Sequence, residues 1–210
     1  MINILIADDH SVIREGLKKI LSENGGKFKA DEASNGQTTL KKIWENDYDV
    51  VVLDISMPGK NGIDILKQVK EIKPTLPVLI LSMYPEDQFA VRVLKCGAAG
   101  YLTKEKAPDE LKDAINKVLE GRKYISSSLA EKLASDLELN YKKPSHERLS
   151  DREYQVMCMI ATGKTLKEIS EELALSITTI STYRSRILKK MKLKNNAEIS
   201  YYAIKHELVK

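Results

Sequence analysis

The chain has 210 residues, of which 42% are hydrophobic and 30% are charged. This composition is typical of a folded chain with one or two domains and excludes disordered and collagen-like proteins. No apolar run approaches the roughly 18 residues of a membrane-spanning helix, and the first residues lack the basic start of a signal peptide. We therefore expect a cytoplasmic protein that makes no membrane contact.

The net charge of +4 belongs to the C-terminal part of the chain. Residues 1–124 hold 19 basic and 19 acidic residues, whereas residues 125–210 hold 15 basic and 11 acidic ones. Residues 173–197 contain no acid, yet they contain Arg184, Arg186, Lys189, Lys190, Lys192 and Lys194. A solvated helix face usually mixes both charges, so this segment favours binding to a polyanion.

The first 122 residues alternate short apolar runs with amphipathic segments. Apolar and β-branched runs predict strands at residues 2–7, 29–33, 49–53, 77–81 and 101–102. Each is followed by apolar residues at helical spacing. Five such strand–helix units predict an α/β domain of the flavodoxin-like type, with a five-stranded parallel sheet in the order 2-1-3-4-5 and helices on both faces.

The pattern changes after residue 122. A helix is possible over residues 126–139, and the polar, proline-containing run 140–146 predicts a linker. Three S/T/N-x-x-E capping boxes then predict helix starts, at Ser150 with Glu153, Thr165 with Glu168, and Asn195 with Glu198, and Ser176 offers a fourth N-cap. We expect one domain at 1–122, a partly helical linker at 123–146, and an all-α domain of four helices at 147–210.

Polar and charged side chains follow the predicted strands of the first domain. Strand one ends in Asp8 and Asp9, strand three in Asp54 and strand four in Ser82, and Lys104 follows strand five. In an open parallel sheet these ends share one crevice. Repulsion among three carboxylates is relieved by a hard divalent cation, above all Mg²⁺.

Such a pocket can accept a phosphoryl group on a carboxylate, and Asp54 is the best-placed nucleophile. Lys104 would pair with the phosphoryl oxygens, and Ser82 would donate a hydrogen bond to one of them. Taken singly, these residues have simpler interpretations: Asp9 as a helix cap, Ser82 as a turn residue and Lys104 as a surface lysine. Their occurrence together at successive strand ends favours the pocket.

Four segments of the first domain resemble the receiver domain of two-component response regulators. They are Ile4-Leu5-Ile6-Ala7-Asp8-Asp9-His10, Val52-Leu53-Asp54-Ile55-Ser56-Met57-Pro58, Leu81-Ser82-Met83 and Gly97-Ala98-Ala99-Gly100-Tyr101-Leu102-Thr103-Lys104. The resemblance implies phosphorylation of Asp54 by a histidine kinase. It implies Mg²⁺ bound directly by Asp9, Asp54 and the Ser56 carbonyl, with Asp8 holding it through water. It also implies that Ser82 and Tyr101 move together as a switch.

The C-terminal domain has a predicted helix at 166–173, a turn at 174–176 and a second helix at 177–190, and these lengths are typical of a helix-turn-helix. The second helix of such a unit enters the major groove of DNA. Its apolar positions Ile180, Ile187 and Met191 would face the core. The side chains expected to face outward are Thr178, Ser181, Thr182, Arg184, Ser185 and Lys189. Hydroxyls and an arginine suit base edges, and lysines suit phosphates.

This domain resembles the LuxR-type helix-turn-helix of the NarL/FixJ family, and the run 181–186 is similar to the branch containing the GacA, BvgA and RcsB regulators. The resemblance is carried by Leu149-Ser150-Asp151-Arg152-Glu153, Ile160-Ala161-Thr162-Gly163-Lys164, Glu168-Ile169-Ser170, Ser176-Ile177-Thr178-Thr179-Ile180 and Lys190-Met191. The full set expected to contact double-stranded DNA is Lys164, Thr165, Thr178, Thr179, Ser181, Thr182, Tyr183, Arg184, Ser185, Lys189 and Lys190. The family also implies a dimer contact on the fourth helix, at Glu198 and Tyr202.

The function expected from these features is that of a transcription factor controlled by phosphorylation of Asp54. It would bind DNA as a homodimer when phosphorylated, and its own chemistry would be limited to self-phosphorylation and slow autodephosphorylation. A Mg²⁺-dependent aspartyl-phosphate hydrolase is an alternative, but such enzymes typically carry a second aspartate where this chain has Ser56. A DNA-binding scaffold with a silent receiver is the other alternative, although it would be expected to lack the acidic ligands.

Overall fold

The computed structural model describes residues 1–23, 26–57, 61–127, 129–131 and 144–209, with only the backbone described at residue 87. The chain divides into two compact units, residues 1–131 and 132–210. The domain limits expected from the sequence remain a prediction, and the helix expected over 126–139 falls largely outside the described residues. Within the described ranges, no helix has the length and apolar character needed to cross a membrane.

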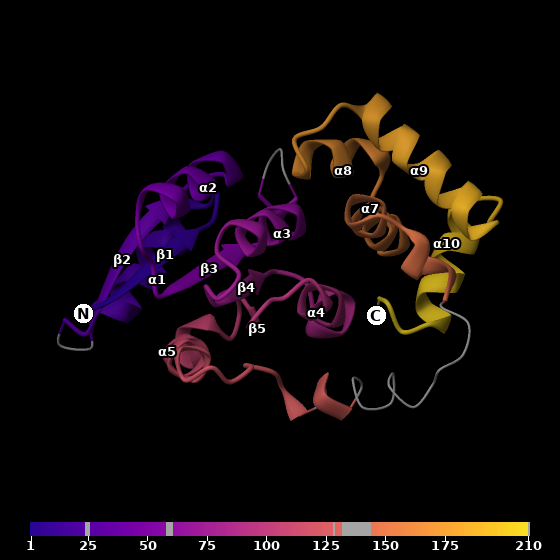
Figure 1. The fold of residues 1–210 in the computed structure, drawn as a ribbon. Helices are drawn as coiled ribbons and strands as arrows, with labels where there is room; N and C mark the ends of the chain where they lie inside the picture. The colour runs from indigo at the N-terminus through magenta and orange to yellow at the C-terminus, as the bar shows by residue number, and fades with distance from the viewer. Residues whose placement is uncertain (24–25, 58–60, 128, 132–143, 210) are drawn as a thin grey trace. The chain divides into compact units, whose positions relative to one another are not determined.

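The first unit is built on a five-stranded parallel sheet in the predicted order, β2-β1-β3-β4-β5 (Figure 1). Its strands are β1 (Ile2–Ala7), β2 (Phe28–Ala33), β3 (Val50–Asp54), β4 (Val78–Ser82) and β5 (Gly100–Thr103). The central strands are nearly continuous in valine, isoleucine and leucine because helices cover both faces of the sheet. The register pairs Ala7 with Leu53 and Asp54 with Leu81, so β1, β3 and β4 end at one edge.

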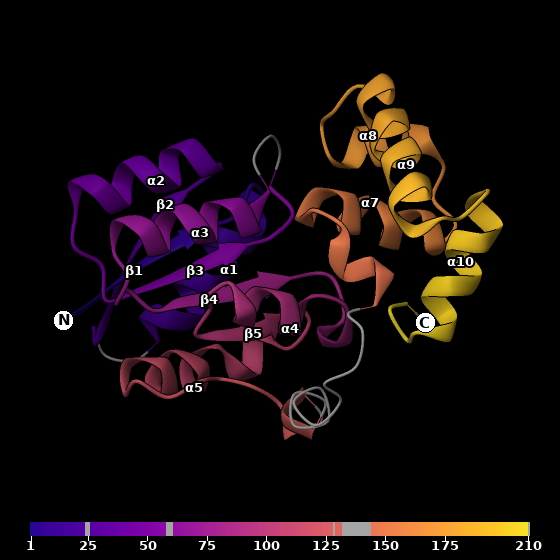
Figure 2. The same ribbon diagram turned by 45° about the vertical axis from the view of Figure 1, so that its right-hand side comes forward.

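Five helices cover the sheet: α1 (Ser11–Ser22), α2 (Gly36–Glu45), α3 (Gly62–Ile72), α4 (Glu86–Lys95) and α5 (Ala107–Leu119). Leu17 of α1 and Leu111 of α5 belong to one buried core with Ile4 and Ile6 of β1. Helices α2 and α3 lie on the opposite face from α5 (Figure 2). This division follows from the alternation of side chains along each strand.

A segment that follows α5 pairs with the sheet next to β5. Tyr124 forms a parallel bridge with Gly100, and its N–H donates to the Ala99 carbonyl at 2.9 Å. A Cβ atom at position 100 would lie 2.6 Å from the Tyr124 carbonyl oxygen, so glycine is required for this close approach. The sequence analysis did not anticipate the pairing, because two bridged residues leave no periodic pattern.

The second unit has the four expected helices, preceded by a short 3₁₀ turn. The elements are η1 (Ser145–Arg148), α7 (Asp151–Ala161), α8 (Leu166–Glu172), α9 (Ile177–Met191) and α10 (Asn196–Lys205). Helix α7 packs against both α9 and α10. Ile180 and Ile187 of α9 and Ile199 of α10 are fully buried. The apolar positions predicted for α9 therefore face the core.

Two of the three predicted capping boxes are complete, at Ser150 with Glu153 and at Thr165 with Glu168. The third prediction was wrong in part. Asn195 accepts a hydrogen bond from the Glu198 N–H at 3.0 Å, but the Glu198 carboxylate accepts the N–H of Lys194 at 2.8 Å. Asn195 has a φ of -155°, against -63° at Ser150, and this rotation turns its own N–H away from the glutamate.

Candidate functional site

Three carboxylates meet at the carboxyl edge of the sheet, as predicted. Asp8 follows β1, Asp9 is the next residue, and Asp54 is the last residue of the neighbouring strand β3. Asp8 and Asp54 are fully buried, and one ligand atom from each of Asp8, Asp9, His10 and Asp54 lies within 4.8 Å of the others. Two oxygens bound to one Mg²⁺ lie at most about 4.2 Å apart, so small side-chain movements would let this oxygen set hold the ion.

Lys104 places an ammonium group among these carboxylates. Its Nζ lies 2.7 Å from Asp8 Oδ2 and 2.8 Å from Asp54 Oδ2. Burial raises the pKa of the Asp54 carboxyl, and the Lys104 charge acts against that rise. Burial also disfavours the ammonium, but the two carboxylates outweigh it and hold the pKa of Lys104 above its ordinary value. The lysine and the acids therefore stabilise one another's charged forms.

The chain after β3 shapes the floor of the pocket. The N–H of Ser56 donates to Asp54 Oδ1 at 3.0 Å, which fixes the orientation of that carboxylate. Asn61 caps α3 by accepting the Ile63 N–H at 2.9 Å, and the Gly62 N–H donates to the Ile55 carbonyl at 3.0 Å. The glycines in the run Met57-Pro58-Gly59-Lys60-Asn61-Gly62 predict a tight loop, and residues 58–60 of that run lie outside the described ranges.

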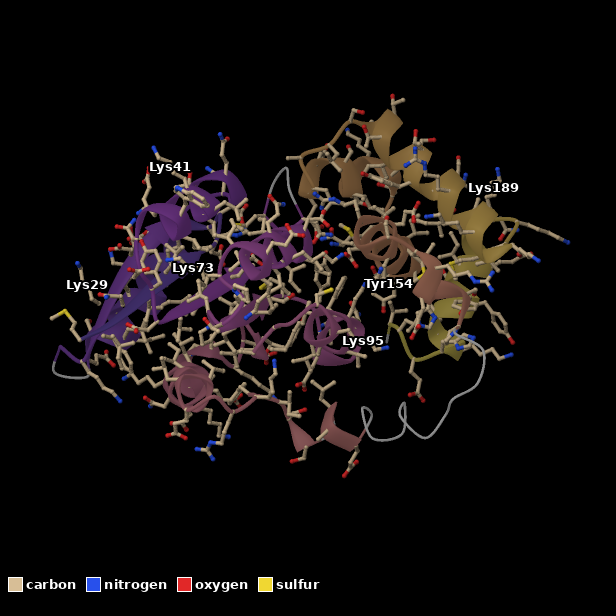
Figure 3. The ribbon with its side chains drawn as sticks, viewed as in Figure 1. Lys29, Lys41, Lys73, Lys95, Tyr154 and Lys189 are labelled. Atoms are coloured by element: carbon tan, nitrogen blue, oxygen red, sulfur yellow. The ribbon has the colours of Figure 1, made fainter. Side chains whose placement is uncertain are left out.

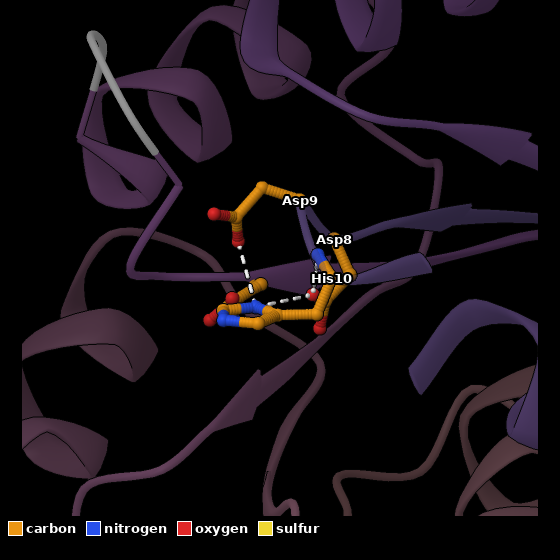
Figure 4. A group of neighbouring side chains, drawn as sticks. Asp8, Asp9 and His10 are labelled. Carbon is orange, nitrogen blue, oxygen red and sulfur yellow. Dashed lines mark hydrogen bonds and ion pairs between the residues drawn. The ribbon is translucent and has the colours of Figure 1, made fainter. Parts of the chain in front are cut away.

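His10 belongs to this cluster, although the sequence analysis gave it no role. Its Nδ1 lies 3.2 Å from Asp8 Oδ1 and 3.0 Å from Asp9 Oδ1, so the ring is placed between the two carboxylates (Figure 4). His10 is also the N-cap residue of α1, which excludes the simpler interpretation of Asp9 as the cap. Its position directly after the two aspartates was the available signal.

Ser82 and Tyr101, the predicted switch pair, are both buried and both contact the backbone of Tyr84. The Tyr84 N–H donates to Ser82 Oγ at 3.1 Å, and the Tyr101 hydroxyl donates to the Tyr84 carbonyl at 2.8 Å. Burial raises the pKa of the Tyr101 hydroxyl above its ordinary value. The chain between β4 and α4 thus links the serine at the pocket to the inward-facing tyrosine.

The first residue of α4 also holds the segment that follows α5. Ser126 donates from its hydroxyl to Glu86 Oε2 at 2.5 Å and from its N–H to Glu86 Oε1 at 3.3 Å. The same hydroxyl accepts the Leu129 N–H at 3.1 Å. The Tyr124 hydroxyl donates to Glu110 of α5 at 2.6 Å. These contacts tie the chain beyond the sheet to both α4 and α5.

In the second unit, the predicted DNA-contacting residues differ in exposure. The exposed ones on α9 are Thr178, Ser181, Thr182, Ser185, Lys189 and Lys190, whereas Thr179, Tyr183 and Arg184 are half-buried. Lys189 extends from α9 away from the core (Figure 3). The hydroxyls of Thr182 and Ser185 donate to the carbonyls of Thr178 and Ser181, at 2.9 and 3.0 Å. With its proton used in this way, each hydroxyl oxygen still has lone pairs that can accept a hydrogen bond.

Two of the predicted basic residues are already paired with acids. Lys190 lies 2.5 Å from Glu153 Oε2, and Lys164 forms an ion pair with Glu172. Burial alone would raise the pKa of the Glu153 carboxyl, but hydrogen bonds from Lys190 and the Ser150 backbone hold that pKa below its ordinary value. The ion pair between Lys190 and Glu153 therefore connects α9 to α7.

The two predicted dimer residues make contacts inside the second unit. The Tyr202 hydroxyl lies 3.1 Å from His146 Nδ1, and the Tyr202 ring lies against His206 with ring centroids 4.2 Å apart. Glu198 accepts the Lys194 N–H, as described above. On the same helix, Tyr201 and Ile204 are 70% and 61% exposed. Their spacing of three residues places both on one face of α10.

Comparisons with known families match both units. The family described as "Response regulator receiver domain" matches residues 4–116, and "Bacterial regulatory proteins, luxR family" matches residues 147–203. Response regulator UvrY of Escherichia coli (strain K12) is 37% identical over 209 residues, which cover 99% of this chain and 96% of UvrY. Response regulator GacA of Pseudomonas aeruginosa is 34% identical over 210 residues, covering 100% of this chain and 98% of GacA.

Solved structures of RcsB are also similar. RcsB from Salmonella enterica serovar Typhimurium, bound to promoter rprA in the presence of phosphomimetic BeF3-, has a TM-score of 0.64 and 27% identity. That match covers 96% of this chain and 98% of the RcsB chain. A structure of the RcsB–DNA complex has a TM-score of 0.59 and 27% identity, with 100% of this chain and 99% of that one covered.

Proposed function

The chain belongs to the response regulators, with an N-terminal receiver domain and a C-terminal LuxR-type domain. On this premise we propose that phosphorylation of Asp54 by a partner histidine kinase controls the binding of α9 to double-stranded DNA. The observation that carries the proposal is the convergence of the buried Asp8 and Asp54 with the half-buried Asp9, where Lys104 places its ammonium against Asp8 and Asp54. A regulator of this kind acts through a change of state and does not need turnover of a substrate.

The proposal assigns Mg²⁺ to the acidic cluster, held by Asp9, Asp54 and the Ser56 carbonyl, with Asp8 acting through water. When bound, the ion would neutralise charge that develops on the transferred oxygens. Asp54 supplies the attacking carboxylate, oriented by the Ser56 N–H. Lys104 exchanges part of its contact with Asp54 for the incoming phosphoryl oxygens, so a positive charge stays next to each negative group.

The proposed signal leaves the pocket through Ser82. A phosphoryl group on Asp54 offers new acceptor oxygens, toward which the Ser82 hydroxyl turns. Because the Tyr84 backbone contacts both Ser82 and Tyr101, movement of this segment changes the position of Tyr101. Glu86 lies two residues after Tyr84 and accepts a hydrogen bond from the Ser126 hydroxyl. The same movement therefore reaches the segment after α5, which leads toward the second unit.

DNA recognition is assigned to α9, the second helix of the helix-turn-helix. Thr182 and Ser185 are exposed, and their hydroxyl oxygens can accept hydrogen bonds from the amino groups that adenine and cytosine present in the major groove. Ser181 and Thr178 extend the same exposed surface, and Lys189 reaches the phosphates. The solved RcsB–DNA complex, which is similar to this chain, supports this mode of action.

The function is tested by comparing DNA binding of the wild-type chain and Lys104→Ala, each with and without acetyl phosphate and Mg²⁺. We expect the phosphodonor to raise wild-type affinity for DNA. Lys104→Ala should keep part of its phosphate labelling but lose the rise, because the charge that links the phosphoryl group to the pocket is gone. Lys112→Ala, which removes a lysine of α5 that pairs with Glu23 at 3.8 Å, is the control. A full rise in Lys104→Ala would contradict the proposal.

Phosphorylation should also promote a homodimer. A single helix-turn-helix makes few base contacts, and two half-sites about 10 base pairs apart double them. One solved structure shows two RcsB dimers bound to two parallel DNAs. Sedimentation of the chain before and after phosphorylation measures the change, and Asp54→Asn should stay in its unphosphorylated state. A monomer in both states, even on DNA, would refute the dimer.

A further inference from the structure

Helix α9 carries two arginines that face different ways. Arg184 and Arg186 are two residues apart, which is a rotation of roughly 200° about the helix axis. Arg184 follows the buried Ile180 by four residues and precedes the buried Ile187 by three, so it lies beside the core stripe. Arg184 is half-buried and Arg186 is exposed.

Arg184 is engaged with the neighbouring helix. Its Nε donates to Asn196 Oδ1 at 2.6 Å, and Asn196 is the first residue of α10. This hydrogen bond orients the guanidinium of Arg184 toward the start of α10. The sequence analysis placed Arg184 among the base-reading residues, but its contact and its position on the helix point to a role in holding α9 against α10.

Arg186 lies with the residues that face outward. Thr182 precedes it by four residues and Lys189 follows it by three, and both are exposed. Lys190 also lies one turn away, but its charge is matched by Glu153. Arg186 and Lys189 are therefore left as a like-charge pair, which is destabilising on a helix unless an anion is bound. Among the described residues, neither of these two side chains forms an ion pair or a hydrogen bond.

We infer that Arg186, together with Lys189, contacts the phosphate backbone of DNA, and that Arg184 is a positioning residue held by Asn196. The inference rests on the proposed function and gives Arg186, so far counted only as part of a basic segment, a specific contact with DNA. Residues nearer the N-terminus of such a helix contact base edges, and Arg186 lies toward its C-terminal end, one turn before Lys189, where a long cationic side chain can reach the phosphates. Counting helical positions from Ile180 was the signal that could have identified it.

The test uses the full phosphorylated chain and two duplexes of equal length. One is selected from a random pool with the wild-type chain, and the other is unselected. Affinity is measured across a salt series for wild type, Arg184→Ala, Arg186→Ala, Arg186→Lys and Asn196→Ala. Circular dichroism reports the helix content of each variant, and thermal unfolding reports its stability.

Arg186→Ala should bind both duplexes roughly tenfold more weakly at low salt and lower the salt slope by about one. Arg186→Lys should restore most of the slope because it keeps the charge. Arg184→Ala and Asn196→Ala should keep the wild-type dependence of affinity on salt. Each should unfold at a lower temperature than wild type, and the double variant should unfold at no lower a temperature than the single variants.

Three results would overturn the inference while leaving the proposed function intact. The first is wild-type binding by Arg186→Ala, and the second is a fall in salt slope for Arg184→Ala as large as that for Arg186→Ala. A loss confined to the selected duplex would also overturn it, because it would make Arg186 a base contact. If the wild-type chain binds neither duplex after phosphorylation, the proposed function fails, and this inference fails with it.

Discussion

Asp54→Asn should abolish labelling of the chain by acetyl phosphate. The substitution nearly preserves the volume of the side chain but removes the anionic oxygen that attacks the phosphoryl group. Asp54 is fully buried, and its two carboxylate oxygens contact Lys104 and the Ser56 N–H. The other acids of the pocket lack this placement on the strand, so we expect none of them to take over the reaction.

Radiolabelled acetyl phosphate with intact-mass measurement shows whether a phosphoryl group is attached. Adding EDTA to the wild-type chain should remove the labelling as completely as Asp54→Asn does, because Mg²⁺ is needed to offset three carboxylates. Asp64→Asn, which changes an exposed acid on α3, is the matched control and should be labelled like wild type. Full labelling of Asp54→Asn at a different residue would show that the phosphoacceptor has been misassigned.

Gly62→Ala should destabilise the first unit strongly. A Cβ atom at this position would lie 2.5 Å from both the Asp54 carbonyl oxygen and Ile55 Cα, and these are backbone atoms that cannot rotate away. Overpacking of this kind costs about 1 to 3 kcal/mol. Because the Gly62 N–H also donates to the Ile55 carbonyl, the displacement would move the chain that carries Asp54. We therefore expect phosphorylation to be impaired as well.

Gly16→Ala is the control, and it should change the stability of the first unit in the opposite direction. Gly16 lies within α1, and no heavy atom would come within 4 Å of an added Cβ. Replacing a helix-interior glycine by alanine should stabilise the unit by about 0.5 to 1 kcal/mol. Hydrogen exchange of peptides from β3 and from α9 across a urea series measures the two units separately. Equal protection of β3 in Gly62→Ala and wild type would show that the backbone accommodates the methyl group.

The parallel sheet, its strand order and the meeting of the acidic side chains could all be predicted from the residues. Apolar runs such as 50–53 repeat at regular intervals, and the rules for connecting parallel strands leave few orders. Once the order is set, Asp8 and Asp54 have to meet, since both follow the carboxyl ends of adjacent strands. The capping boxes at Ser150 and Thr165 were readable for a similar reason, because each involves residues only three positions apart.

Which charges are already paired, and which are left for a partner, depends on how the helices pack and could not be predicted from the residues. The sequence counts Lys190 and Arg186 as equal members of one basic segment, but Glu153 of α7 matches the first and leaves the second exposed. The link from Glu86 to Ser126 likewise joins residues 40 positions apart. Local periodicity predicts the face on which a residue lies, but a pair formed between two elements depends on how those elements pack. A difference of a few ångströms then decides whether a lysine pairs with an acid on a neighbouring helix or stays available to DNA.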